Sequence, residues 1–339
     1  MMNAVLYERL VRPLMFSLPA ETAHHVAMGA LRLLGSTPAT LRMLQSSGVS
    51  EKPVELFGLT FRNPVGLAAG FDKNAVALPA WEALGFGYVE IGTVTAKAQP
   101  GNSKPRIFRY PEHKAIINRL GFNNDGADTI AARLGKLRAS GRWPRIPVGI
   151  NLGKSKITPI AEAAEDYAYS LRRLRSFADY LVLNVSSPNT PGLRTLQDYA
   201  ALNTLLRAAQ RENVAGEKPL LVKIAPDISP EDLGQIVAAC EANGVSGLIA
   251  TNTTLDHTSV GERDQGGGLS GAPLAAKADE IIRAIVAQTA LPVIGVGGIM
   301  SGADAHEKFR AGAKLVQVYT GFVYRGPALI REIVEALAN

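Results

Sequence analysis

Short apolar runs rich in β-branched residues recur along the chain from about residue 53 onward, and amphipathic stretches separate them. Near-continuous apolar runs are typical of parallel strands that are covered on both faces. The stretches between them, such as 159–175 and 229–243, have the apolar spacing of helices. The apolar runs are PVGLAA (64–69), YVEIGTV (88–94), PVGINLG (147–153), YLVLNVS (180–186), PLLVKIA (219–225), GLIATNT (247–253), PVIGVGG (292–298) and LVQVYTG (315–321).

This alternation of eight strands with helices predicts an α/β protein with a closed (β/α)8 TIM barrel. An open doubly wound sheet is the alternative, and the lone GVGG string at 295–298 is weak support for it. The number of runs favours the barrel.

The first 46 residues have a different pattern. Apolar positions at helical spacing run through NAVLYERLVRPLMFSL (3–18) and ETAHHVAMGALRLLG (21–35), with no strand pattern between them. We therefore divide the chain into a small N-terminal helical extension, residues 1–46, and the barrel, residues 47–339. The extension is either a hairpin that caps one end of the barrel or an amphipathic pair that lies on a membrane surface.

Nearly every apolar run ends in small or polar residues, as in AAGFDKN (68–74), LNVSSPNTPG (183–192) and ATNTT (250–254). In (β/α)8 barrels the active site forms at the carboxyl ends of the strands. A barrel with a purely structural role would not need such endings, so the pattern predicts an enzyme.

Composition narrows the choice of partners. The chain is 47% hydrophobic and 19% charged with a formal net charge of +6, yet no block of five or more Lys and Arg residues occurs, so we expect no nucleic-acid partner. No apolar run reaches the length of about 18 residues that a membrane span needs, and we find no signal-peptide pattern. The single cysteine, Cys240, excludes an internal disulfide and indicates a reducing compartment. We expect a cytosolic protein, or one attached to a membrane surface without crossing it.

Glycines concentrate at the ends of the last two predicted strands and before one helix. The strings are GVGGI (295–299), VYTGFVYRGP (318–327) and SGAP (270–273), in which Gly271 offers a further backbone donor. Such glycines let backbone N–H groups approach a phosphate, and the loops after strands seven and eight are the common phosphate site of this fold. Plain turns are the alternative.

Two lysines lie within or directly after apolar runs, where a charged side chain is unusual. Lys223 is flanked by apolar residues on a predicted interior strand, where an unpaired ammonium group is costly. It faces either the anionic ring edge of a reduced flavin or an acid such as Asp227. Lys73 follows the first strand and either meets a substrate carboxylate or a flavin, or is a solvated loop residue.

Amide side chains gather at several predicted strand ends, in NVSSPNTPG (184–192), NRLGFNN (118–124) and TNTT (251–254). Amides both donate and accept hydrogen bonds without titrating, as a cyclic imide requires. The asparagines therefore predict a site for a pyrimidine-like ring, with a loop rich in Asx turns as the alternative. There is no HExxH motif, Cys/His cluster or acidic triplet, so we predict no metal site.

Taken together, these motifs resemble those of the membrane-associated, quinone-linked dihydroorotate dehydrogenases (class 2, bacterial type), and the resemblance covers essentially the whole chain. It implies one FMN per chain and oxidation of (S)-dihydroorotate to orotate in de novo pyrimidine biosynthesis, with ubiquinone or menaquinone as electron acceptor. The strings that carry it are NPVGLAAGFDKN, EIGTVTAKAQPGNSKPRIFR, INRLGFNN, LNVSSPNTPGLR, VKIAPD, ATNTT, GGLSGAPL, GVGGI and VYTGFVYRGP.

The resemblance also implies a role for each matching residue. Ser187 would be the catalytic base; the soluble class uses a cysteine there, and Cys240 lies elsewhere. The substrate would be held by Lys73, Asn118, Arg119, Leu120, Gly121, Phe122, Asn184, Asn189, Asn252 and Thr253. FMN would be held by Ala69, Gly70, Thr93, Asn151, Asn184, Lys223, Thr251, Gly271, Gly298, Tyr319 and Thr320. The quinone would approach His24, Arg109 and Tyr319.

Because the sequence contains neither a targeting segment nor a membrane span, we expect a bacterial enzyme attached peripherally to the cytoplasmic face of the inner membrane, and we expect a monomer. Three alternatives stay open at this point. They are a soluble dihydroorotate dehydrogenase that uses fumarate or NAD, an FMN barrel that acts on tRNA uridines, and a non-catalytic phosphate-binding barrel.

Overall fold

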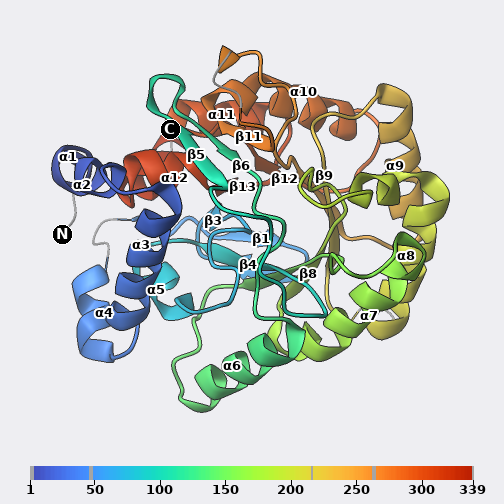
Figure 1. The fold of residues 1–339 in the computed structure, drawn as a ribbon, viewed down its shortest axis with the longest axis horizontal. Coiled ribbons are helices and arrows are strands. Elements are labelled where there is room, and N and C mark those ends of the chain that lie inside the picture. The colour runs from blue at the N-terminus through green and yellow to red at the C-terminus, as the bar shows by residue number, and fades with distance from the viewer. Residues whose placement is uncertain (1–3, 46–48, 215–216, 262–264, 338–339) are drawn as a thin grey trace.

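A closed barrel of eight parallel strands forms the centre of the computed structural model (Figure 1). The structure describes residues 4–45, 49–214, 217–261 and 265–337. The barrel strands are β3 (Val65–Leu67), β4 (Tyr88–Val94), β7 (Val148–Leu152), β8 (Tyr180–Asn184), β9 (Leu220–Ile224), β10 (Gly247–Ala250), β12 (Val293–Val296) and β13 (Leu315–Val318). Each of the eight predicted runs contains one of these strands, so the barrel prediction is confirmed and the open sheet is excluded.

Helices cover the outside of the barrel (Figure 1). They are α5 (Leu78–Ala83), α6 (Ala127–Ala139), α7 (Ala163–Leu174), α8 (Tyr199–Glu212), α9 (Pro230–Ala242), α10 (Ala275–Val286), α11 (Gly302–Arg310), α12 (Thr320–Arg325) and α13 (Ala328–Ala336). Serine caps start two of them: Ser229 accepts a hydrogen bond from the Asp232 N–H, and Ser301 from the Asp304 N–H. The apolar faces of these helices pack against the outward side chains of the strands to form the main core.

Two tyrosines fill the barrel interior. Tyr88 and Tyr180 are fully buried with their rings 6.4 Å apart. Facing glycines make room for them, because a Cβ atom on Gly66 would lie 2.3 Å from the Tyr88 ring and one on Gly149 would lie 2.1 Å from that of Tyr180. The hairpin of β1 (Val54–Leu56) and β2 (Leu59–Phe61) packs against these tyrosines and covers the end of the barrel interior at which they lie.

A second sheet, which the sequence analysis did not predict, lies outside the barrel. It is antiparallel and joins β5 (Ile107–Tyr110) and β6 (Ala115–Asn118) to β11 (Gly268–Gly271). Short helical turns lie at Pro111–His113, Ile160–Glu162, Arg175–Phe177, Leu193–Gln197 and Ala272–Leu274. Through β6 and β11, loops from distant parts of the sequence are held side by side.

The N-terminal segment is helical and contains no strand within its described residues. It comprises α1 (Ala4–Leu6), the π-helical turn η1 (Tyr7–Val11), α2 (Arg12–Phe16), α3 (Ala20–Leu34) and α4 (Pro38–Leu44). Polar contacts fix it to the barrel: the Tyr7 hydroxyl donates to the Val323 carbonyl at 2.8 Å, and Arg325 pairs with Glu8 at 2.7 Å. These helices lie at one side of the barrel, next to α5 and α12 (Figure 1).

One ion pair anchors α3. Glu21 and Arg106 approach to 2.7 Å with side chains that are 13% and 6% exposed. Arg106 also donates to the carbonyls of Pro100 and Asn102. Burial alone would raise the pKa of Glu21, but the hydrogen bonds and charge of Arg106, with Lys104, outweigh it and hold this pKa below its ordinary value.

This pair predicts a pH-dependent stability. Because the pKa of Glu21 is lowered in the folded protein, its contribution is present above the ordinary glutamate pKa of 4.5 and disappears as pH falls through the lowered value. Glu21→Gln should therefore reduce the free energy of unfolding by about 1 kcal/mol at neutral pH and by less in acid. Denaturant titrations at several pH values measure this. Glu51→Gln, which removes an exposed pair with Arg62, is the control and should change little. A loss that is constant with pH would contradict the assignment.

Candidate active site

A cavity of about 470 Å³ extends from the N-terminal helices to the carboxyl ends of the barrel strands. Apolar residues from the helices line one part of it, among them Met15, Ala23 and Leu31. Asparagine, serine, threonine and lysine side chains from the strand ends line the other part. All the predicted site residues lie along this cavity except Asn151 and Arg119.

Four asparagines face the polar part of the cavity and contact one another in pairs. Asn252 donates to Asn184 at 3.3 Å, and Asn189 donates to the Asn118 side chain at 3.2 Å. Asn184 also donates to the Thr93 hydroxyl at 3.0 Å. These contacts fix the direction of each amide, so the cavity presents a defined set of donors and acceptors rather than a mobile polar loop.

Ser187 lies on the loop after β8 and is 6% exposed. Its Oγ accepts a hydrogen bond from the Asn189 backbone N–H at 3.3 Å, and the hydroxyl lines the cavity. Within the described ranges, no carboxylate or imidazole accepts a hydrogen bond from it. The hydroxyl is therefore directed by the backbone and is free to meet a ligand.

Lys223, at the end of β9, is a buried cation. No hydrogen bond or ion pair joins its ammonium group to any residue that the structure describes. Burial lowers the pKa of Lys223, and the charge of Glu90 partly opposes this effect. Asp227 is not its partner, since that carboxylate contacts Lys277 at 2.6 Å and Arg194 at 3.2 Å. An anionic or electron-rich ligand would compensate this charge.

Lys73 is partly buried and lines the same cavity. Its Nζ donates to the Gly70 carbonyl at 2.6 Å. Burial, together with the charge of Arg106, lowers the pKa of Lys73 to about 8. The loop that carries it is held by the buried carboxylate of Asp72, which accepts from the backbone of Val76 and Ala77 and from the Trp81 indole. Lys73 is thus a rigidly held cation that faces the cavity.

The predicted phosphate loops contain glycines in conformations that favour glycine. Gly271, Gly297 and Gly298 have φ values of 102°, 116° and 79°. At Gly298 a Cβ atom would lie 2.3 Å from the Ala275 Cα, so only a bare backbone fits there. The N–H groups of Gly298 and Thr320 have no acceptor among the described residues, and both residues line the cavity. Two free N–H groups beside a cavity suit an anion.

Phe71 joins the residues expected at the quinone end. Its ring lies 5.4 Å from that of His24 and 5.1 Å from that of Tyr319. Burial, with smaller effects from Lys73 and His25, lowers the pKa of His24 to about 3, so this imidazole is neutral at physiological pH. Arg109 donates to the carbonyls of Met15, Phe16 and Leu18, and so ties β5 to the end of α2.

Two predicted residues lie outside the cavity lining. Asn151 is fully buried; its side chain accepts from the Thr93 hydroxyl at 2.6 Å and donates to Glu90 at 2.8 Å. It therefore supports Thr93 from behind. The Arg119 side chain is directed to the surface, where it donates to the Gln265 carbonyl and lies over the Phe108 ring. Only the backbone of Arg119 remains available for the predicted role.

Several lining residues were not anticipated. Phe71, Ile107, Ile116 and Met300 contribute apolar surface, and Gln317 and Ser270 contribute polar atoms. A signal existed for Gln317, because it is a polar residue in the middle of an apolar strand. The apolar residues gave no such signal, since apolar positions of core and cavity look alike in sequence.

Known proteins resemble this chain closely. A family model described as Dihydroorotate dehydrogenase matches residues 52–339. The dihydroorotate dehydrogenase (quinone) of Salinispora arenicola is 53% identical over 98% of this chain and 99% of the relative. That of Gloeobacter violaceus is 51% identical over 98% and 94%. A crystal structure of DHODH from Eimeria tenella in complex with ferulenol is 40% identical, has a TM-score of 0.85, and covers 94% of this chain and 90% of that chain.

The glycine geometry yields a prediction for stability. Gly298→Ala should lower the free energy of unfolding by about 2–4 kcal/mol, because the new Cβ adds both a clash and an unfavourable φ. Gly141→Ala is the matched control: its φ is 69° but no atom lies within 4 Å of the new Cβ. It should cost only about 1 kcal/mol. Denaturant unfolding compares the two, and equal losses would show that the contact with Ala275 is unimportant.

Proposed function

Because the chain belongs to the dihydroorotate dehydrogenase family and is a flavin-dependent enzyme that oxidises dihydroorotate to orotate with a quinone as acceptor, we propose how its cavity serves that reaction. The observation that carries the proposal is the convergence of Ser187, Lys223 and the four asparagines on one cavity that continues into an apolar part. The polar part would hold flavin and substrate, and the apolar part would admit the quinone.

We propose that the flavin is FMN, one per chain. When bound, FMN accepts two electrons from the substrate and delivers them to the quinone. The free N–H groups of Gly298 and Thr320 suit its phosphate, and the uncompensated ammonium group of Lys223 suits a ring that gains negative charge on reduction. The remaining contacts would come from Ala69, Gly70, Thr93, Thr251, Gly271, Tyr319 and Asn184, with Asn151 behind Thr93.

The substrate would lie against the asparagines. Asn118, Asn184, Asn189 and Asn252 match the imide edges of a dihydropyrimidine, with Thr253 and the 118–122 backbone beside them. Lys73 would pair with the substrate carboxylate. Ser187 would take the proton from C5 of dihydroorotate. A serine is a weak base, so its rigid placement by the Asn189 N–H and the exclusion of water carry much of the effect.

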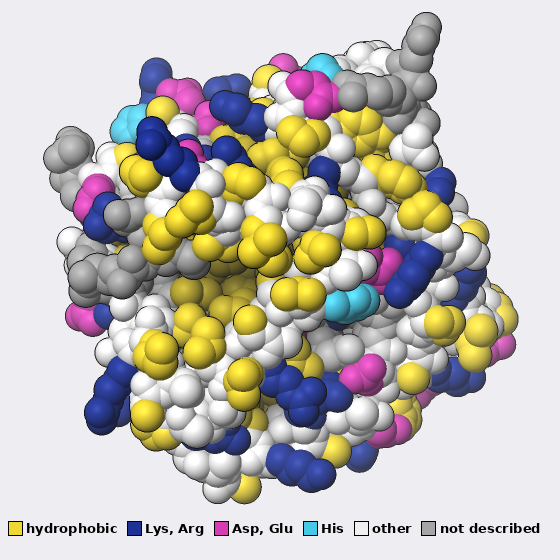
Figure 2. All heavy atoms as spheres, turned by 60° about the vertical axis from the view of Figure 1, so that its left-hand side comes forward, with side chains coloured by type: hydrophobic (Ala, Val, Ile, Leu, Met, Phe, Trp, Pro, Cys, Tyr) yellow, Lys and Arg dark blue, Asp and Glu magenta, His cyan; other side chains and the backbone are white. Residues whose placement is uncertain are grey.

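The quinone, ubiquinone or menaquinone, would enter through the N-terminal helices and approach His24, Tyr319 and Arg109. Figure 2 shows hydrophobic side chains gathered around a hollow on the face that these helices form. Exposed apolar residues of the helices include Leu10, Leu14, Leu33 and Met43, each more than 60% exposed. Among the described helices, none is long and apolar enough to cross a bilayer.

We therefore propose that this face rests on a membrane surface, at the cytoplasmic side of the bacterial inner membrane. We also propose that the monomer is the working form, since the helices and the barrel of one chain together enclose the cavity.

The role of Ser187 is testable in one half-reaction. Ser187→Ala should retain its flavin, but anaerobic reduction of that flavin by dihydroorotate should slow by roughly 10²–10⁴-fold, the usual contribution of a positioned base. Stopped-flow absorbance measures this rate. As a control, the flavin of the same variant is reduced chemically and mixed with quinone. This reoxidation should proceed at the wild-type rate, because it does not involve the base. The flavin released on denaturation should have the mass of FMN.

Other outcomes would redirect the proposal. An unchanged reduction rate in Ser187→Ala would remove the serine from the chemistry. Reoxidation of the wild type by fumarate or NAD, but not by quinone, would place the enzyme with the soluble class instead.

The membrane face yields a second prediction. Replacing Leu14 and Leu33 with glutamate should weaken binding to lipid vesicles by at least about tenfold for each residue, because each substitution removes a leucine that would be buried in the lipid. Vesicle co-sedimentation measures binding, and the anaerobic reduction rate should stay unchanged. The control replaces Leu255 and Val286 with glutamate. These are also exposed apolar residues, but they lie in the barrel part of the chain. Equal loss of binding in the control would show that the N-terminal helices are not the contact surface.

A further inference from the structure

The loop that carries Ser187 is joined to two neighbouring strand ends by one guanidinium group. We propose that Arg194, held by Asp227, is a positioning residue that sets the Ser187 loop against the Asn252–Thr253 segment. The inference rests on the proposed function, since it takes Ser187 as the base and this segment as a substrate contact.

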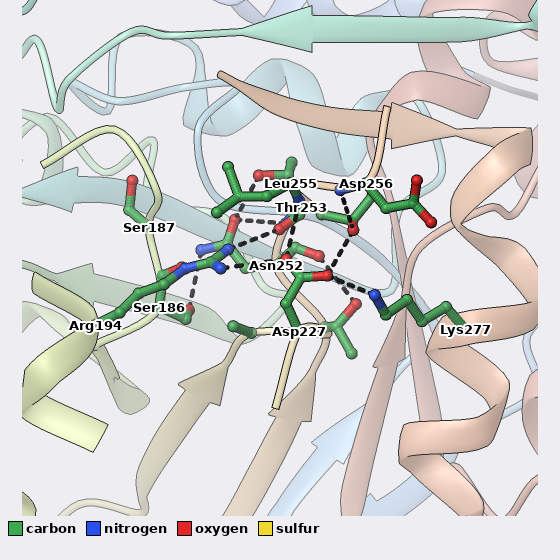
Figure 3. A network of polar contacts seen from close by, with 12 residues as sticks. Ser186, Ser187, Arg194, Asp227, Asn252, Thr253, Leu255, Asp256 and Lys277 are labelled. Atoms are coloured by element: carbon green, nitrogen blue, oxygen red, sulfur yellow. Dashed lines mark hydrogen bonds and ion pairs between the residues drawn. The ribbon is translucent and has the colours of Figure 1, made fainter. Parts of the chain in front are cut away.

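Arg194 lies in the short helical turn Leu193–Gln197, which follows the Ser187 loop. Its Nε donates to the Ser186 carbonyl at 3.1 Å, and its Nη2 donates to the Thr253 carbonyl at 3.2 Å. Its Nη1 donates to the Asp227 carboxylate at 3.2 Å. One planar group therefore connects the loops after β8, β9 and β10, as Figure 3 shows.

Asp227 holds the guanidinium in place through contacts of its own. Its Oδ1 accepts from the Thr254 hydroxyl and from the Lys277 ammonium, both at 2.6 Å, and its Oδ2 accepts from the Leu255 N–H at 2.8 Å. The carboxylate side chain is only 19% exposed. With this many donors, Asp227 is fixed, so the direction in which it holds Arg194 is also fixed.

The contact with the Ser186 carbonyl affects Ser187 directly, because that carbonyl belongs to the peptide bond between Ser186 and Ser187. Fixing this peptide plane fixes the point from which the Ser187 side chain extends. In Figure 3, Ser186 lies within the network while the Ser187 hydroxyl stands apart from it. Arg194 thus orders the backbone of the base and leaves its hydroxyl free for chemistry.

A second link connects the same two loops. The Asn252 side chain donates to the Ser186 hydroxyl at 3.0 Å and accepts from the Thr253 N–H at 2.8 Å. Asn184 adds to this link, because its Oδ1 accepts from the Ser186 hydroxyl at 3.1 Å and from Asn252 at 3.3 Å. Without Arg194, these two amides would connect Ser186 to the Asn252–Thr253 segment. Both amides are also assigned to the substrate, whereas the Arg194 guanidinium contacts only the loops, so the amides alone would fix the loops less firmly.

The competing explanation is a salt bridge that serves only the fold. Arg194 and Asp227 are 22% and 19% exposed, and pairs that reach solvent usually add little to stability. A purely structural role would lower the unfolding temperature and the flavin content without acting on one chemical step. A positioning role acts on removal of the C5 proton, because displacement of a reacting group by about 1 Å can cost as much as 100-fold in rate.

The test compares Arg194→Ala with Arg172→Ala, a control that removes an arginine paired at 2.7 Å with Glu212 on the outside of the barrel. Arg194→Ala should reduce flavin with dihydroorotate roughly 10–100-fold more slowly, with flavin content and quinone reoxidation as in the wild type. Substrate deuterated at C5 should show a larger isotope effect than with the wild type. Guanidinium ion should restore part of the rate, and methylammonium should not. The control variant should match the wild type throughout.

Each outcome separates the two proposals. If Ser187→Ala slows reduction but Arg194→Ala does not, the positioning role is wrong and the proposed function stands. If Ser187→Ala reacts like the wild type, the proposed function fails, whatever Arg194 does. If Arg194→Ala does not fold, Asp227→Asn is measured instead. That variant should also raise the isotope effect at C5, and an unchanged isotope effect would overturn the inference.

Discussion

Closure of the barrel is the constraint on which the rest of the structure depends. β13 pairs with β3, so the last strand of the barrel completes the ring that the first one began. Because all strands are parallel, their carboxyl ends meet at a single mouth. Lys73, Ser187 and Thr320 are far apart in sequence, yet they reach one cavity for this reason alone.

Charges buried at that mouth must be compensated, and the chain does so in two ways. Asp227 is surrounded by protein donors, and its contacts are complete without any ligand. Lys223 has no such partner in the described part of the chain and has only the more distant charge of Glu90. The first arrangement stabilises loop geometry, whereas the second costs folding free energy that a bound group can recover. By this difference, Asp227 stabilises the loops of the site, whereas Lys223 is available to bind a ligand.

Sequence reasoning succeeded where a local pattern has one structural meaning. Eight apolar runs predicted eight strands, and the asparagines at strand ends predicted a polar mouth. It failed where the paired strands are distant in sequence. β11 pairs with β6 across about 150 residues, and no hydrophobic periodicity predicts such pairing. Arg119 matched a motif, but its side chain is drawn to the Gln265 carbonyl and Phe108 on the surface. Arg194 ends the LNVSSPNTPGLR string (183–194), but no local pattern predicts its contacts with Asp227 and Thr253, which follow later strands.

The cavity combines an apolar part, lined by the N-terminal helices, with a polar part at the strand ends. Burial lowers the pKa of His24 to about 3 and that of Lys73 to about 8, so at neutral pH the first is uncharged and the second still carries a proton. The Phe71 ring contacts both His24 and Tyr319 and packs beside Trp81, which bonds to the Asp72 carboxylate of the Lys73 loop. The same aromatic cluster thus supports a neutral apolar side and a charged polar side. An enzyme that receives electrons from an anionic substrate and passes them to an apolar acceptor needs this division, because each reactant then meets only the surface that suits it.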